Sequence, residues 1–174
     1  MSELLNQAKG VRLFIFDVDG VLTDGTLYLG DDGQEYKAFN SLDGHGMKML
    51  KASGVELAII TGRRSQCVSH RAANLGIAHL HQGVEDKLAA YETLIGSLGL
   101  APGQTGYMGD DVVDLPVLRR VGFAVCVPAA PDVVKAHVHY VTQRPGGRGA
   151  AREVCELVMQ AQQTFDAQMA AYRA

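Results

Sequence analysis

The sequence predicts an α/β protein with a doubly wound, mostly parallel sheet. Short, almost continuously apolar runs, such as residues 11–16 and 55–60, alternate with segments of helical pattern. Strands of that composition are buried on both faces by flanking helices. Several of these runs end directly in polar clusters. Because ligands of such folds bind outside the carboxyl ends of the strands, the same pattern predicts where a site lies.

Length and composition predict one soluble domain over residues 1–174. The chain has 174 residues, which is enough for a single hydrophobic core. Its net charge of −3 argues against a nucleic-acid partner or an anionic membrane. Its three cysteines show no pairing pattern, and no apolar run reaches the roughly 20 residues of a membrane span. We therefore expect a cytoplasmic protein that acts on a small molecule.

The elements follow from hydrophobic periodicity and from turn residues. In the first half we expect a strand at 11–16, a β-hairpin over about 25–39 with its turn at 30–33, a helix at 46–52 and a strand at 55–60. In the second half we expect helices at 65–74, 84–98, 115–121 and 132–136, and strands at 77–81, 104–108, 123–127 and 138–142. A glycine-rich loop at 144–149 and a helix from residue 150 complete the C-terminal part, 144–174.

Asp17 and Asp19 directly follow the first strand. Residues i and i+2 of a strand point to one side, so the two carboxylates face the same small volume. At 4 Å they repel by about 4 kcal/mol at an effective dielectric of 20, so their pairing requires a cation or a shared proton. Asp17 is a candidate nucleophile for phosphoryl transfer and Asp19 a candidate general acid and base. The alternative is a pair of turn aspartates that cap a helix.

Other polar residues fall at the same predicted edge of the sheet. The Thr61 hydroxyl and the Gly62 N–H are placed to hold phosphate oxygens, and Lys87 can neutralise their charge. Asp110 and Asp114 lie one helical turn apart at another strand end. Each has an ordinary alternative, as a helix cap, a surface lysine or an acidic helix start. Together, three carboxylates beside a phosphate require cations, and Mg²⁺ fits that chemistry.

The order of these motifs resembles the haloacid dehalogenase-like phosphatase superfamily. The resemblance implies that Asp17 is phosphorylated and that Asp19 is the acid and base. It also implies Mg²⁺ ligation by Asp17, the backbone carbonyl of Asp19 and Asp110, with Asp111 and Asp114 behind them and phosphate bound by Thr61, Gly62 and Lys87. Only 41 residues separate Asp19 from Thr61, so the usual cap domain has no room. We expect oligomerisation through the hairpin to close the site instead.

Three further segments, 39–46, 59–63 and 146–153, are similar to the 3-deoxy-D-manno-octulosonate 8-phosphate phosphatase family. This resemblance implies Mg²⁺-dependent hydrolysis of that sugar phosphate for lipopolysaccharide biosynthesis by a homotetramer. It implies substrate contacts at Asp19, Asn40, Ser41, Leu42, Asp43, Gly44, Lys48, Arg63, Arg71 and Lys87, with Arg148 reaching a neighbouring subunit. Positive charge at Lys48, Arg63 and Arg71 suits a sugar carboxylate.

Alternative functions remain open from the sequence. A related nine-carbon sugar acid phosphate satisfies the same logic as the eight-carbon substrate. A non-catalytic oligomerisation partner of a sugar-nucleotide enzyme is another possibility, which the intact motifs disfavour. A phospho-acceptor signalling module is disfavoured because its phosphorylated aspartate ends the third strand, where residues 79–82 contain none.

Overall fold

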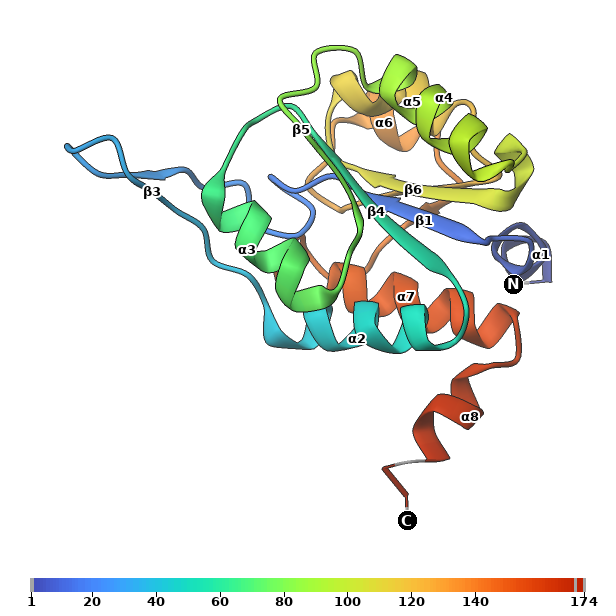
Figure 1. Ribbon diagram of the computed structural model, residues 1–174. Coiled ribbons are helices and arrows are strands. Elements are labelled where there is room, and N and C mark those ends of the chain that lie inside the picture. Colours follow the sequence, from blue (N-terminus) through green and yellow to red (C-terminus); the bar gives the residue numbers. More distant parts are fainter. Residues whose placement is uncertain (1, 171, 174) are drawn as a thin grey trace.

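The computed structural model describes residues 2–170 and 172–173. Six parallel strands form one sheet in the order β5-β4-β1-β6-β7-β8 (Figure 1). In chain order they are β1 (Leu13–Phe16), β4 (Glu56–Thr61), β5 (His79–Gln82), β6 (Thr105–Gly109), β7 (Phe123–Cys126) and β8 (Tyr140–Val141). The parallel sheet flanked by helices confirms the predicted fold class.

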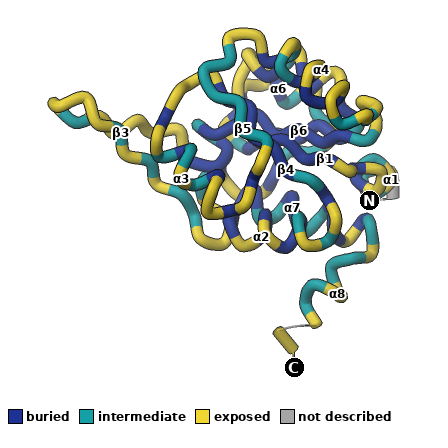
Figure 2. The backbone as a smooth tube through the Cα atoms, viewed as in Figure 1, coloured by how far each residue is buried: buried dark blue, intermediate teal, exposed yellow. Residues whose placement is uncertain are grey.

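Helices cover both faces of the sheet. On one face α2 (Ser41–Ala52) and α7 (Ala150–Ala161) lie side by side, and α3 (Gln66–Leu75) adjoins α2 (Figure 1). On the other face lie α4 (Lys87–Leu98), α5 (Leu115–Leu118) and α6 (Asp132–Lys135). The strands between these layers are the buried centre of the molecule (Figure 2).

Strand β1 fixes the position of the predicted nucleophile. It pairs with β4 on one side and β6 on the other, and all four of its residues are fully buried. Phe16 lies opposite Ile59 and Met108, and the next backbone N–H, that of Asp17, donates to the Met108 carbonyl at 3.0 Å. Asp17 therefore emerges at the carboxyl edge of the sheet, between the ends of β4 and β6.

The hairpin of β2 (Tyr28–Leu29) and β3 (Glu35–Tyr36) projects from the body of the molecule (Figures 1 and 2). Its paired segments are shorter than the predicted arms because no other layer packs beneath them, and an isolated two-stranded ribbon gains little stability. Apolar side chains on it are nevertheless exposed, namely Leu27, Tyr28, Leu29 and Tyr36.

Helix α2 begins at Ser41 and not at residue 46, which corrects the predicted boundary. The Asn40 side chain accepts hydrogen bonds from the N–H groups of Leu42 and Asp43, as a helix N-cap does. Gly46, which the sequence placed near a helix start, lies inside the helix. A Cβ at this position would press against Arg152, so glycine allows the close approach of α7.

Other boundaries differ in ways that local contacts explain. Helix α4 begins at Lys87 and not at residue 84, because the Asp86 side chain accepts from the N–H of Ala89 at 3.0 Å and caps it. The C-terminal helix is interrupted after Ala161, where Gln163 takes a left-handed φ of 59°, before α8 (Phe165–Ala170).

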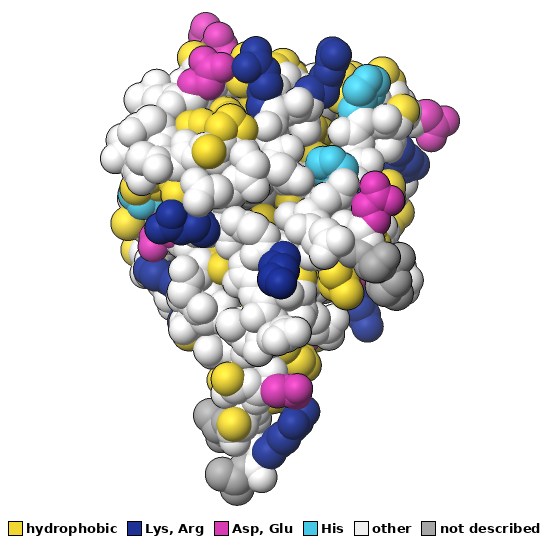
Figure 3. Space-filling model, turned by 90° about the vertical axis from the view of Figure 1, so that its right-hand side faces the viewer, with side chains coloured by type: hydrophobic (Ala, Val, Ile, Leu, Met, Phe, Trp, Pro, Cys, Tyr) yellow, Lys and Arg dark blue, Asp and Glu magenta, His cyan; other side chains and the backbone are white. Residues whose placement is uncertain are grey.

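Helix α1 (Ser2–Lys9) was not among the predicted elements. It packs beside α7, and the Gln162 side-chain amide donates to the carbonyl of Val11 at 2.6 Å just beyond it. Figure 3 shows the end of the molecule that faces away from the hairpin, where cationic and anionic side chains are interspersed and α8 narrows to the lower tip. Within the described residues, no helix combines the length and apolarity needed to cross a bilayer.

Candidate active site

The polar residues predicted at the sheet edge, apart from the fully buried Asp114, line one pocket of about 280 Å³. Its lining comes from the ends of β1, β4 and β6, the start of α4 and the loops that follow them. It includes Asp17, Asp19, Thr61, Gly62, Arg63, Lys87, Asp110 and Asp111. Four chain segments far apart in the sequence thus converge as the fold class predicts.

Lys87 lies between two buried carboxylates. Its Nζ is 2.8 Å from Asp17 Oδ2 and 2.6 Å from Asp114 Oδ1. Burial alone would lower the pKa of Lys87, but Asp17 and Asp114 outweigh that effect and raise it, so the side chain is an ammonium. Burial raises the pKa of Asp17 to about 6, although Lys87 acts in the opposite direction. One lysine does not compensate the carboxylates gathered here.

The uncompensated charge is concentrated on Asp110. Burial, followed by repulsion from Asp17 and Asp114, raises its pKa to about 7. Its carboxylate accepts no hydrogen bond from any residue in the described part of the chain, and the Asp17, Asp110 and Asp114 carboxylates each offer an oxygen within 4.8 Å of the others. Gly20 has φ +84° and passes so close that a Cβ would overlap the Asp110 carboxylate. The donor set suits a hard divalent cation.

Asp114 supports the other groups and is not a free ligand. Its Oδ1 accepts from Lys87 and from the Tyr107 hydroxyl, each at 2.6 Å, and its Oδ2 accepts from the N–H groups of Asp110 and Asp111. Tyr107 was missed at the sequence level. A tyrosine inside a fully buried strand needs a partner for its hydroxyl, which is the signal that could have identified it.

The end of β4 and the loop after it present hydrogen-bonding groups to the pocket. Thr61 is 2% exposed, and its hydroxyl makes no hydrogen bond with residues 2–170 or 172–173. The backbone N–H of Val84 donates to the Thr61 carbonyl at 3.1 Å, and that of Gly83 to the Arg63 carbonyl at 3.2 Å. These bonds fix the loop that carries Gly62 and Arg63.

Asp19 belongs to a closed ring of four charged side chains, which we call the Asp19 ring: Asp19, Lys37, Glu35 and Arg63. Lys37 Nζ contacts Asp19 Oδ1 and is 3.0 Å from Glu35 Oε1. Arg63 completes the ring at 3.8 Å from Asp19 Oδ2 and 3.6 Å from Glu35 Oε1. Lys37 and Glu35 were not predicted as site residues, although their i, i+2 spacing on a hairpin strand places both side chains on one side.

Several residues predicted to contact substrate are engaged elsewhere in the same chain. Asp43 is buried, and its carboxylate accepts from the N–H groups of Gly149 at 3.1 Å and Arg152 at 2.8 Å, at the start of α7. Arg71 donates to the Asn40 carbonyl at 2.9 Å and covers the Phe39 ring. Together with Gly44 these residues line a small separate cavity of about 10 Å³.

The remaining predicted contact residues lie on the surface. Ser41, Leu42 and Lys48 are exposed on α2, away from the pocket lining. Arg148 is also exposed, and its guanidinium is 3.5 Å from Asp24 Oδ2. In this single chain the structure does not bring these four side chains to the pocket.

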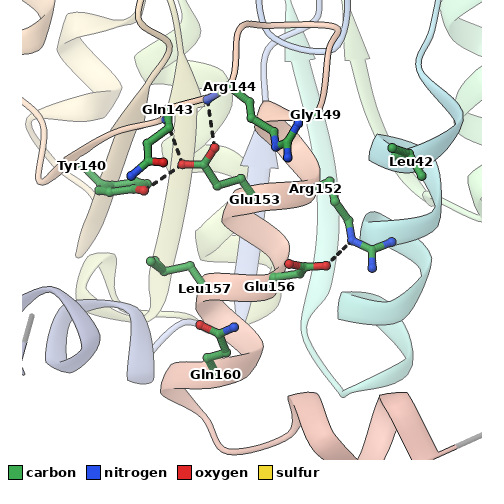
Figure 4. Close-up of a pocket in the computed structure, with 10 residues that line it drawn as sticks. All are labelled: Leu42, Tyr140, Gln143, Arg144, Gly149, Arg152, Glu153, Glu156, Leu157 and Gln160. Carbon is green, nitrogen blue, oxygen red and sulfur yellow. Dashed lines mark hydrogen bonds and ion pairs between the residues drawn. The ribbon is translucent and has the colours of Figure 1, made fainter. Parts of the chain in front are cut away.

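A second hollow of about 500 Å³ lies along α7 and includes Leu42 (Figure 4). Its carboxylates and Arg152 already have partners within the chain. Glu153 accepts from the Tyr140 hydroxyl at 2.7 Å and from the N–H groups of Gln143 and Arg144, both at 2.9 Å. Arg152 pairs with Glu156. These contacts anchor the glycine-rich loop to α7.

Comparisons with known proteins agree with this geometry. A family model described as haloacid dehalogenase-like hydrolase matches residues 77–153. The 3-deoxy-D-manno-octulosonate 8-phosphate phosphatase of Yersinia pestis is 47% identical over 165 residues, which cover 95% of this chain and 88% of that protein.

Solved structures are similar over the whole chain. A protein from Pseudomonas syringae described as a probable YrbI-family phosphatase has a TM-score of 0.98 and 50% identity, covering 100% of this chain and 99% of that one. The 3-deoxy-D-manno-octulosonate 8-phosphate phosphatase of Moraxella catarrhalis, solved in complex with magnesium ion, phosphate ion and the sugar acid, has a TM-score of 0.97 and 46% identity, covering 99% of each chain. This chain therefore belongs to the 3-deoxy-D-manno-octulosonate 8-phosphate phosphatase family of haloacid dehalogenase-like hydrolases.

Proposed function

We propose that this protein is a Mg²⁺-dependent phosphatase that converts 3-deoxy-D-manno-octulosonate 8-phosphate to 3-deoxy-D-manno-octulosonate and phosphate. The observation that carries the proposal is the presence of two differently held carboxylates in one pocket. Asp17 is buried against Lys87, whereas Asp19 lies at the more open side within the Asp19 ring. Hydrolysis through a covalent intermediate needs such a nucleophile and a separate proton carrier.

In the first step an Asp17 carboxylate oxygen attacks phosphorus. The bond from phosphorus to the sugar oxygen breaks, and Asp19 gives its proton to that oxygen. Lys87, whose Nζ is 2.8 Å from Asp17 Oδ2, offsets the negative charge of the nucleophile and of the phosphoryl group. The Thr61 hydroxyl and the Gly62 N–H hold the non-reacting phosphoryl oxygens.

In the second step the Asp19 carboxylate takes a proton from water as the water oxygen attacks the aspartyl phosphate. The bond between phosphorus and Asp17 breaks, which releases phosphate and restores the nucleophile. Mg²⁺, held by Asp17, Asp110 and the Asp19 carbonyl, supplies the positive charge that lets an anionic phosphate approach these carboxylates. Asp114 keeps Lys87 and the Asp110 backbone in place, with Asp111 beside it.

Substrate selection is proposed to involve more than one subunit of a homotetramer. Arg63 of the same chain, 47% exposed, binds the sugar carboxylate. Exposed residues of a neighbouring chain complete the site. Less exposed residues behind them support the surface that this neighbouring chain presents to the substrate. The exposed set is Ser41, Leu42, Lys48 and Arg148, and the buried or half-buried set is Asn40, Asp43, Gly44 and Arg71. The exposed apolar side chains of the hairpin support self-association.

The cellular setting belongs to the same proposal. The protein is proposed to act as one catalytic domain in the cytoplasm, where its product enters lipopolysaccharide biosynthesis. The connection from β1 to β4 holds only the hairpin and α2, so water is excluded by neighbouring subunits and not by a cap. No nucleic acid or membrane partner is expected. Sedimentation should give a tetramer, and an active monomer would contradict this part.

A phosphate-release screen over six- to nine-carbon sugar phosphates tests the function. The highest kcat/KM is expected for the eight-carbon 3-deoxy sugar acid phosphate, with activity abolished by EDTA and restored by Mg²⁺. A higher kcat/KM for a nine-carbon sugar acid phosphate would change the substrate and leave the mechanism intact. Metal-independent turnover, or none with any substrate, would contradict the proposal.

A further inference from the structure

We propose that Lys37 is a positioning residue that holds the Asp19 carboxylate in place for proton transfer to the leaving oxygen. The inference rests on the proposed function, because it assigns Asp19 the proton. The two residues are 18 positions apart, and Lys37 directly follows strand β3 of the hairpin. The hairpin thereby contributes a group to the active site of its own chain.

Burial separates the two cations of the Asp19 ring. The Lys37 side chain is 1% exposed, whereas that of Arg63 is 47% exposed. Transfer of an ammonium from water to such a place costs several kcal/mol unless carboxylates compensate it. Asp19 and Glu35 both do so, Glu35 at 3.0 Å from Nζ. A buried lysine that contacts two carboxylates has few other places for its charge, which suits it to fixing the orientation of Asp19.

Arg63 holds Asp19 more loosely and has another partner to bind. Its distances to the two carboxylates of the ring, 3.8 and 3.6 Å, exceed those of a charge-assisted hydrogen bond. When Arg63 turns to a substrate carboxylate, Lys37 continues to hold Asp19. The two cations of the Asp19 ring thus have different roles. Arg63 is available to bind the ligand, and Lys37 stays bound to Asp19.

Orientation matters because Asp19 is a proton donor in the first step. A general acid works within about 2.6–3.2 Å of the oxygen that it protonates. Asp19 follows β1 in a loop, so its backbone alone does not fix the side chain. Without the ammonium, the Asp19 and Glu35 carboxylates would face Arg63 alone, and Asp19 would turn toward it and away from the leaving oxygen.

The test compares leaving groups in the Lys37→Met variant. An alkyl phosphate such as the sugar phosphate needs a proton on its leaving oxygen, whereas p-nitrophenyl phosphate releases a stable phenolate and needs none. kcat/KM reports the steps through phosphoryl transfer to Asp17. We expect Lys37→Met to lower kcat/KM for the sugar phosphate by about 10²-fold and that for p-nitrophenyl phosphate by less than about fivefold. Lys37→Arg should restore part of the loss.

Controls separate this role from general damage. Lys135→Met removes a surface lysine that pairs with Asp132 at 3.7 Å, and it should leave both substrates unaffected. Asp19→Asn should show the same leaving-group selectivity as Lys37→Met, and larger. Lys37→Gln, which keeps a donor without the charge, replaces the methionine variant if that one fails to fold.

The outcomes are distinguishable. Equal losses on the two phosphates, or no loss on either, would overturn the role of Lys37 while wild-type turnover leaves the proposed function standing. A wild-type protein that hydrolyses neither phosphate would overturn the proposed function and this inference together.

Discussion

The cluster of Asp17, Asp110 and Asp114 differs from the environment of Asp43, although both bury carboxylates. In the cluster one lysine faces three acidic groups, and the Asp110 carboxylate has no donor among the described residues. Asp43 instead accepts from two backbone N–H groups at the start of α7. A surplus of negative charge indicates a cation-binding site. A carboxylate whose hydrogen bonds are satisfied by backbone N–H groups indicates a structural contact, which we call the structural joint between α2 and α7.

The largest effect is expected in Asp17→Asn, which should abolish turnover without lowering the stability of the fold. Loss of the nucleophile should reduce kcat for the sugar phosphate by at least about 10⁴-fold. The unfolding midpoint in EDTA should not fall, because burial already raises the pKa of Asp17 to about 6 and the neutral amide relieves that cost. Turnover and chemical denaturation measured on one preparation check both expectations. Residual activity above one per cent would contradict the assignment.

Mg²⁺ should stabilise the folded protein through the Asp17 cluster alone. At a concentration 100 times its Kd, a ligand that binds only the folded state adds about 2.7 kcal/mol to the free energy of unfolding. The increase should disappear in Asp110→Asn and persist in Asp43→Asn. Thermal unfolding with Mg²⁺ and with EDTA measures it. An equal response of the two variants would contradict the contrast between the two regions.

Asp43→Asn should mainly affect stability. The amide keeps one acceptor but presents an NH₂ group to a backbone N–H, which costs about 1–3 kcal/mol. Chemical denaturation should therefore show a lower free energy of unfolding, with the folded protein still binding Mg²⁺. Asp166→Asn, which alters an exposed carboxylate on α8, is the matched control and should be silent. Unchanged stability of Asp43→Asn would argue against the structural joint.

The smallest effect is expected in the pH dependence of stability without metal. The pKa of Asp110 is about 7 in the folded protein and near 3.8 when unfolded. Between these values the folded state binds more protons, so this group lowers the free energy of unfolding as pH rises. The full shift corresponds to roughly 4 kcal/mol, which solvent screening of this partly exposed group reduces. Asp110→Asn should therefore be the more stable protein at pH 8 in EDTA, by about 1 kcal/mol, and match wild type near pH 4. A constant difference across this range would contradict the pKa assignment.

The sequence predicted the sheet-edge site because each of its residues directly follows a strand or begins a helix. Strand composition alone brings Asp17, Thr61 and Asp110 together. Lys37 and Glu35 were missed because their role depends on how the hairpin folds back over the loop after β1, which no periodicity records. The start of α2 was misplaced because its glycines are unfavourable within a helix. Gly44 is required there by the side chains of α3, and Gly46 by the approach of α7.

The pairing of β1 on both sides has a consequence for motion. Its amides should exchange with solvent only when the whole domain opens, whereas those of the hairpin, which pair only with each other, should exchange by local opening. Asp17 is joined to the part that opens last. Asp19, two residues later, forms an ion pair with Lys37, which follows β3 at the base of the hairpin. The hairpin is the part that opens first. If hairpin opening limits turnover, the group displaced is the proton donor, while the attacking atom stays in place.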